Sequence, residues 1–192
     1  LISTLKEAYK CFPATEFQLK SGSRFASLQQ INDGKADLGI GPWFHLFHAQ
    51  GEYESFTVGE FEIVLAALPE FVNHQTDFTF KELSDLPSAT IAKSQFSFDS
   101  EKLSNYRGGR QIKASDITSL KTLLLGGVGW AVIPKHLIEV ELQEGSLIQL
   151  NCLDKESNCK VEVRTFRRSD KVHGPVAEHI WRSLQAAAAS NK

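Results

Sequence analysis

The sequence lacks long apolar runs, an export signal and an excess of basic residues. No apolar run approaches the roughly 20 residues that a membrane-spanning helix needs. Charged residues at Lys6, Glu7 and Lys10 interrupt the first segment, which is therefore not organised like a signal peptide. The 21 Lys and Arg residues are outnumbered by 23 Asp and Glu residues, whereas a nucleic-acid surface normally shows a basic excess. These absences argue against a membrane protein, and against a chain that binds nucleic acid by itself.

Cysteine is scarce as well. Three cysteines, an odd number, are more typical of reduced thiols in a cytosol than of a disulfide framework, so we expect a cytoplasmic protein. Cys152 and Cys159 flank a predicted hairpin turn at residues 153–158 and would face each other across it. A redox switch and two unreactive thiols both fit this pattern. Cys11 lies near the apolar face of the first expected helix, where it would contribute to packing.

Sequence patterns of catalysis are also missing. Gly127-Val128-Gly129 lacks the third glycine of a dinucleotide-binding motif and precedes a strand instead of a helix. There is no G-x-S-x-G nucleophile elbow. His45 and His48 lie three residues apart but have no nearby pair of partner ligands. We therefore predict that the chain is not an enzyme and holds no metal or cofactor.

Hydrophobic patterning indicates an α/β protein. A length of 192 residues with 42% hydrophobic residues suits one domain, or two small lobes, with a real core. Helical spacing of apolar residues predicts helices at 1–12, 25–32, 80–86, 117–125, 134–144 and 176–184. Alternating or continuous apolar runs predict strands at 16–20, 36–41, 61–68, 88–92, 130–133, 147–150 and 160–166. Because strands alternate with helices, largely parallel sheets are expected.

The order of elements in residues 112–150 is the most informative. A polar turn at Ser115 and Asp116 opens an apolar helix, and Gly126-Gly127 ends it, because glycine readily adopts the left-handed backbone of a helix end. A buried strand follows. Pro134 then stands where the first turn of a helix needs no N–H donor. That helix is expected to end at Gly145, before another strand.

This order resembles the effector-binding domain of LysR-type transcriptional regulators. A second match is the family's pattern "DG-x-AD-L-x-I", met by Asp33-Gly34 and by Ala36-Asp37-Leu38-Gly39-Ile40 after a helix, a strand, a Gly-Ser turn and a helix. A third runs from Arg167-Arg168-Ser169-Asp170 to Gly174-Pro175, before the last helix. The three pieces occur in the family's order and spacing and span nearly the whole chain.

The resemblance implies an α/β fold of two lobes joined by two crossing strands, as in type-II periplasmic binding proteins. The crossings would be Phe61–Leu68 and Lys160–Phe166. Lobe I would then hold residues 1–61 and 165–192, and lobe II residues 62–164. The family's winged helix-turn-helix, its linker helix and the first strand of lobe I have no counterpart here. We therefore expect a fragment that senses a ligand but does not read operator DNA.

The implied function is small-molecule sensing and oligomerisation for a bacterial LysR-type regulator. The effector would shift the population between lobe arrangements. The domain would form a homodimer or homotetramer, and would meet operator DNA only through the absent N-terminal domain. An alternative from another class is a free-standing periplasmic solute-binding protein of a transporter, which shares the two-lobe fold.

In the family the effector lies between the lobes, above the strand ends. The residues of this chain at those positions, which are the predicted ligand contacts, are Ser23, Gly41, Pro42, Trp43, Lys93, Ser94, Gln95, Ser115, Asp116 and Ile117.

Several of these residues have a plain structural interpretation beside the functional one. Ser23 also suits a simple turn. Trp43 would either wall the cleft or lie half-buried under a loop. Ser115 or Asp116 would cap the helix that follows, a role compatible with ligand contact because a helix start leaves N–H groups free. Residues 93–95 would otherwise form a solvated loop.

The predicted effector is a small polar molecule that carries a carboxylate or a similar anion. The N–H groups of the helix starting near Ile117 would attract such a group, and Lys93 would add charge. Asp116 would repel it if its side chain turned inward. Pro42 has no side-chain donor where some relatives have a basic group.

Overall fold

The structure is a computed structural model that describes residues 1–22, 26–43, 52–92 and 108–190. The chain divides into two compact units, unit 1 with Leu1–Glu60 and Glu162–Lys192, and unit 2 with Phe61–Val161. Among the described residues, no helix has both the length and the apolar character needed to span a membrane.

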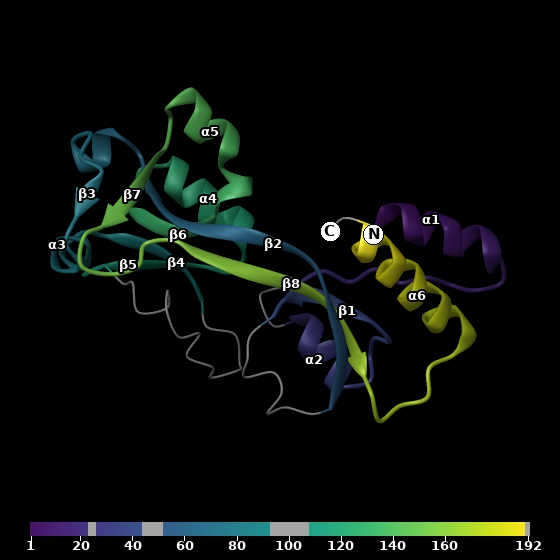
Figure 1. The fold of residues 1–192 in the computed structure, drawn as a ribbon. Coiled ribbons are helices and arrows are strands. Elements are labelled where there is room, and N and C mark those ends of the chain that lie inside the picture. The colour runs from purple at the N-terminus through teal and green to yellow at the C-terminus, as the bar shows by residue number, and fades with distance from the viewer. Residues whose placement is uncertain (23–25, 44–51, 93–107, 191–192) are drawn as a thin grey trace. The chain divides into compact units, whose positions relative to one another are not determined.

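The helices and strands are labelled in Figure 1. The α-helices are α1 (Ile2–Cys11), α2 (Ala26–Asn32), α3 (Phe80–Asp85), α4 (Ile117–Leu125), α5 (Glu139–Glu144) and α6 (Pro175–Ser190), and the 3-10 helices are η2 (Glu70–Val72) and η3 (Lys135–Leu137). The strands are β1 (Gly39–Pro42), β2 (Tyr53–Ala67), β3 (Asp77–Phe78), β4 (Ser88–Ile91), β5 (Gln111–Ala114), β6 (Trp130–Pro134), β7 (Ile148–Cys152) and β8 (Cys159–Arg168).

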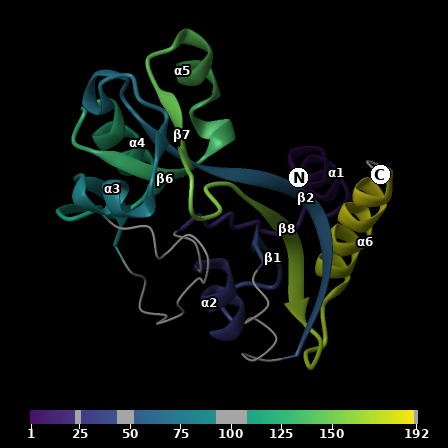
Figure 2. The same ribbon diagram turned by 60° about the vertical axis from the view of Figure 1, so that its left-hand side comes forward.

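In unit 1, helices cover both faces of a small antiparallel sheet. β8 lies between β1 and β2, and α1 and α6 pack on one face while α2 packs beside β1 on the other, as Figure 2 shows. Ala8, Ile180 and Leu184 are buried between α1, α6 and the sheet. The buried guanidinium of Arg167 links α6 to the sheet. It forms ion pairs with Glu54 of β2 at 2.8 Å and with Glu178 of α6 at 2.7 Å.

Unit 2 has a core on each side of its sheet. β4 is parallel to β5 and β6, and β2 is antiparallel to β6 and β7. Val64 and Ala66 of β2 point into the core under α4, whereas Leu65 and Ala67 point into the core with α3 and β3. The continuous apolar run of β2 is therefore explained by burial on both faces, as predicted.

The predicted dominance of parallel strands is wrong. β1–β8, β2–β6 and β2–β7 are antiparallel pairs, so the sheet is mixed. Parallel strands of one sheet need a crossover connection such as α4, which joins β5 to β6 while both of these strands pair with β4. The long strands β2 and β8 instead pair with neighbours that run the opposite way.

Residues 16–20, predicted as a strand, form none in the structure. Phe17 packs at the edge of the unit 1 core, but Leu19, predicted on the same face, is 73% exposed. Alternation alone does not make a strand, because the backbone also needs a neighbouring strand for its N–H and C=O groups. β1 begins at Gly39, three residues later than predicted, and takes in Pro42, which an edge strand tolerates.

The expected helix between Pro134 and Gly145 is divided. Pro134 closes β6, the 3-10 helix η3 follows, and only the last part is α-helical. The two predicted glycine stops are confirmed, since Gly127 and Gly145 have φ values of 69° and 75°.

The predicted hairpin between Cys152 and Cys159 is also wrong. β7 pairs with β2 and β3, not with β8, and each thiol has its own local partner. Cys152 Sγ bonds an oxygen of Asp154 at 3.2 Å, and Cys159 Sγ lies 3.5 Å from the oxygen of Lys160. Cys11, expected to pack, is exposed, and all three cysteines are free thiols.

Candidate functional site

Asp116 is the N-cap of α4, the role predicted for it or for Ser115. Its Oδ1 accepts a hydrogen bond from the backbone N–H of Ser119 at 2.9 Å. Its Oδ2 accepts from the hydroxyls of Ser115 and Ser119 at 2.8 Å and 2.9 Å. The Ser119 N–H and then these two hydroxyls lower the pKa of Asp116, so it is ionised at neutral pH.

This capping network fixes what the start of α4 offers to a ligand. The Ser115 hydroxyl donates its only hydrogen to Asp116, so toward a ligand it can act only as a hydrogen-bond acceptor. The Asp116 carboxylate offsets the positive end of the α4 dipole. Ile117 packs against the core under α4. At this place the chain therefore offers acceptors and negative charge.

The end of β1 in unit 1 is built around Gly41. Gly41 lies opposite Arg164 of β8, and Pro42 opposite Val163. A Cβ atom at Gly41 would lie 2.9 Å from Ser27 Oγ of α2, so only glycine lets α2 approach this closely without rearrangement. The N–H of Trp43 donates to the oxygen of Glu162 at 2.8 Å and extends the pairing beyond Pro42.

Trp43 is a buried member of an aromatic cluster. Only 7% of the residue is exposed, and its ring lies 5.4 Å from that of Phe166 and 6.2 Å from that of Tyr53. Tyr53 also bonds Asn32 of α2 through its hydroxyl, and burial is the main reason why its pKa is raised. The cluster holds β1, β8, β2 and α2 together at this end of unit 1.

Arg164 and Ser27 are polar residues at this place that the sequence pattern did not point out. Arg164 Cζ lies 5.5 Å from the centre of the Trp43 ring, within the range of a cation–π contact. The alternation in 160–166 indicated a strand, but only the register places Arg164 beside Gly41. The sequence gives no signal that Ser27 lies near Gly41, because the two come together only through the packing of α2 against β1.

The remaining predicted contacts, Ser23, Lys93, Ser94 and Gln95, lie outside the described residues, as do His45 and His48. Within the described ranges, no group of three or more His, Cys, Asp or Glu side chains is placed to hold a metal ion.

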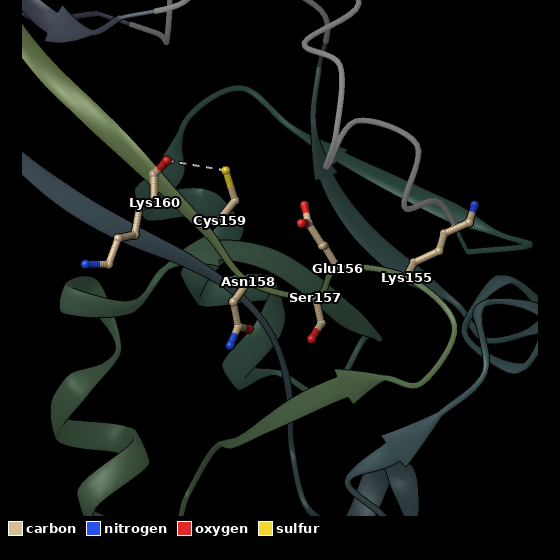
Figure 3. A pocket seen from close by; sticks show the side chains of 6 residues that line it. All are labelled: Lys155, Glu156, Ser157, Asn158, Cys159 and Lys160. Atoms are coloured by element: carbon tan, nitrogen blue, oxygen red, sulfur yellow. Dashed lines mark hydrogen bonds between the residues drawn. The ribbon is translucent and has the colours of Figure 1, made fainter.

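Neither of two pockets on the surface has polar side chains that converge on a common point, as a ligand site would. The larger, in unit 2, is lined by six consecutive residues, Lys155 to Lys160, whose side chains point in different directions in Figure 3. Lys155 Nζ lies over the Phe80 ring, 3.2 Å from its centre. The smaller, in unit 1 beside Lys171 and His173, has a volume of about 60 Å³, well below the ~300 Å³ of a typical metabolite pocket.

Comparison with known proteins identifies the family. The chain matches the family model described as the LysR substrate binding domain over residues 1–189. The chain belongs to this family. No curated protein matches it in sequence. The chain is therefore the effector-sensing domain of a LysR-type regulator, and this prediction from the sequence is confirmed, while the solute-binding alternative is not favoured.

Solved regulatory domains have the same fold at low sequence identity. That of HypT from Salmonella typhimurium is 17% identical with a TM-score of 0.70, over 99% of this chain and 91% of that one. That of CcmR from Synechocystis PCC6803, in complex with 2-PG, is 16% identical with a TM-score of 0.71, over 97% and 90%. That of NMB2055 (MetR) from N. meningitidis is 13% identical with a TM-score of 0.67, over 98% and 87%. The predicted type-II periplasmic-binding-protein-like fold is confirmed.

Proposed function

We propose that this domain senses a small polar organic molecule through residues at the end of β1 and at the start of α4. Gly41, Pro42 and Trp43 contribute from unit 1, and Ser115, Asp116 and Ile117 from unit 2. The two units are the two lobes of the sensor. The observation that carries the proposal is the match to the LysR substrate binding domain over residues 1–189, with polar groups at both places.

The capping network narrows the ligand chemistry at α4. Because Ser115 offers only lone pairs and Asp116 is ionised, the ligand group that binds here is a hydrogen-bond donor, such as a hydroxyl or an amine. An anionic group of the effector is held elsewhere. CcmR in complex with 2-PG supports a small-molecule ligand for a domain of this fold.

The domain signals without catalysing a reaction. It acts in the bacterial cytoplasm, and operator DNA is bound by a separate N-terminal domain of the regulator. The one basic pair that stands out in the sequence supports this division of labour. Arg167 is paired with Glu54 and Glu178, and Arg168 with Asp170, so neither is free to neutralise phosphates.

The domain assembles as a homodimer or homotetramer. Apolar side chains are exposed on α1, where Ile2 is 72% and Tyr9 is 67% exposed, and in unit 2, where Ile112 is 47% and Leu125 is 39% exposed. In a two-fold dimer, residues 1–20 of one subunit would cover residues 117–133 of the other, twice. Sedimentation should show a dimer at micromolar concentration that Tyr9→Glu dissociates, and a monomer for the unmodified chain would contradict it.

Calorimetry tests the effector site. The chain is titrated with organic acids, amines and neutral metabolites, and the best ligand is then titrated into Ser115→Ala. Loss of one hydrogen bond should weaken binding about 2- to 10-fold. Ser146→Ala, which removes an exposed hydroxyl of unit 2 bonded to Glu141, is the matched control and should bind normally. Equal binding by both variants would rule out the α4 contact.

A further inference from the structure

Arg164 stands at the end of β1, on the side of the sheet where α2 packs. It lies directly opposite Gly41 in the antiparallel pair of β1 and β8. Residues opposite each other in such a pair project from the same side of the sheet. Gly41 has no side chain, and among the described residues Ser27 Oγ is the one atom within 4 Å of a Cβ placed there. Ser27 and Arg164 therefore lie on the same side of the sheet, Ser27 beside Gly41 and Arg164 opposite it across the strand pair.

The guanidinium of Arg164 has hydrogen-bond donors to spare. Nε donates to Glu162 Oε2 at 2.9 Å, and Nη1 donates to Ser55 Oγ at 3.3 Å. A guanidinium carries five N–H groups, so three of them have no partner among the residues that the structure describes. The side chain is 28% exposed, so solvent reaches part of it.

The group is also held in position before any ligand binds. The Ser55 hydroxyl fixes one edge, and the Trp43 ring lies 5.5 Å from Cζ. Trp43 in turn is buried against Phe166. A side chain that is already oriented loses less conformational freedom on binding than a mobile surface arginine would.

A second donor lies on the same side of the sheet, beside Gly41. The Ser27 hydroxyl of α2 is half-buried and has no hydrogen-bond partner in the described part of the chain. Both groups therefore lie on the same side of the sheet with unused donors, Ser27 beside Gly41 and Arg164 opposite Gly41 in the strand pair. One carboxylate competes for Arg164, but Glu162 is 50% exposed and bonds only at Nε. An exposed ion pair of this kind contributes little to stability. The ion pair with Glu162 therefore does not explain why Arg164 is packed against the buried Trp43 ring.

We propose that Arg164, with the Ser27 hydroxyl on the same side of the sheet, is the specificity-determining residue that recognises a carboxylate of the effector. This assignment rests on the proposed function and deepens it. The free Nη groups donate to the carboxylate oxygens, as in the paired arginine–carboxylate contacts of other proteins. The effector is then an organic acid, and its carboxylate is the group by which the domain distinguishes it from the corresponding amide.

Pairs of acids and their amides test the assignment. Calorimetry compares lactate with lactamide, alanine with alaninamide and benzoate with benzamide on the unmodified chain, Arg164→Gln, Arg164→Lys and Ser27→Ala. An acid that binds the unmodified chain should bind Arg164→Gln roughly 10- to 100-fold more weakly, the loss expected for one charge-assisted contact. Arg164→Lys should restore only part of the affinity, because an ammonium lacks the planar fork. Glu162→Gln should strengthen acid binding, because it removes the competing carboxylate.

The control is Arg182→Gln, which removes the same charge from unit 1 at a side chain that is 80% exposed. It should leave acid binding unchanged. Structural damage would weaken acid and amide alike, so an Arg164→Gln effect confined to the acid supports recognition. If Arg164→Gln does not fold, Arg164→Lys and Ser27→Ala carry the same comparison. Equal binding of the acid by Arg164→Gln overturns the assignment and leaves sensing intact. Binding of amines or amides alone also overturns it, whereas no binding of any compound overturns the proposed function as well.

Discussion

The end of β1 and the start of α4 both hold a carboxylate, yet they offer a ligand opposite chemistry. At α4 the Asp116 carboxylate consumes the hydroxyl hydrogens of Ser115 and Ser119, so acceptors remain. At β1 the Glu162 carboxylate takes one N–H of Arg164, so donors remain. The comparison teaches that the charge of a residue says less about a binding surface than the donors and acceptors that its neighbours leave unused.

The two places also differ in burial, because the end of β1 contains the buried Trp43 ring whereas the cap at α4 is exposed. The largest expected effect tests this difference. Trp43→Ala removes a buried indole from the cluster with Tyr53 and Phe166. Large-to-small changes of this kind cost about 3–5 kcal/mol. Urea unfolding should therefore show a strongly lowered free energy of unfolding. Val172→Ala, at a fully exposed apolar residue of unit 1 outside the proposed dimer contact, is the control and should change it little.

A difference below about 1 kcal/mol between Trp43→Ala and the unmodified chain would mean that the cluster at β1 collapses around the cavity at low cost. The aromatic cluster would then not hold Arg164 rigidly, and the end of β1 would be no more firmly packed than the exposed cap at α4.

Much of unit 2 could be predicted from the sequence, because local signals fix it. The helix after Asp116, its stop at Gly127 and the buried strand β6 are set by residues within a few positions of one another. The end of β1 could be predicted only in part. Gly41 and Trp43 belong to a local motif, but Arg164 becomes their neighbour through the register of β1 and β8, which no local pattern fixes.

The failed strand at residues 16–20 has the same cause. The alternation of Phe17 and Leu19 is a local signal, whereas a strand depends on a partner that only the tertiary fold supplies. The predicted hairpin between Cys152 and Cys159 failed because β7 and β8 each found other neighbours.

Buried hydroxyls give a second contrast between the two units. Thr165 of β8 is fully buried and its Oγ1 has no hydrogen-bond partner in the described part of the chain, whereas the buried Ser88 hydroxyl accepts from the N–H of Gly108 at 2.9 Å. Thr165→Val replaces the unsatisfied hydroxyl by a methyl group of the same shape and should stabilise the fold by about 1 kcal/mol. Ser88→Ala should destabilise it by about 1 kcal/mol because it leaves the Gly108 N–H without its partner. Thermal unfolding of both variants would contradict the contrast if the two shifts had the same sign.

A smaller effect is expected from the charge of Asp116, because its carboxylate is exposed to water. Hydrogen bonds from Ser119 and Ser115 lower the folded-state pKa below the ordinary value of 3.8. The stabilisation is therefore complete above the unfolded-state pKa and is lost as the pH falls through the folded-state pKa. Asp116→Asn keeps a side-chain oxygen for the cap but lacks this titration. The unmodified chain should be the more stable one at pH 7, and the two should converge below pH 3.8; a constant difference would show that the charge plays no part.

The smallest effect on stability, and the sharpest test of the space beside Gly41, comes from Gly41→Ala. The new Cβ would lie 2.9 Å from Ser27 Oγ, which is the end of a side chain that can rotate away. Unfolding should therefore change by less than about 1 kcal/mol, the order of an off-rotamer side chain, while acid binding weakens because the Ser27 hydroxyl is displaced. The double variant Gly41→Ala with Ser27→Ala should recover the stability but not the binding. Full acid affinity in Gly41→Ala would mean that the ligand does not occupy the space between Ser27 and Arg164, and the contrast in donors between the two places would then have no bearing on recognition.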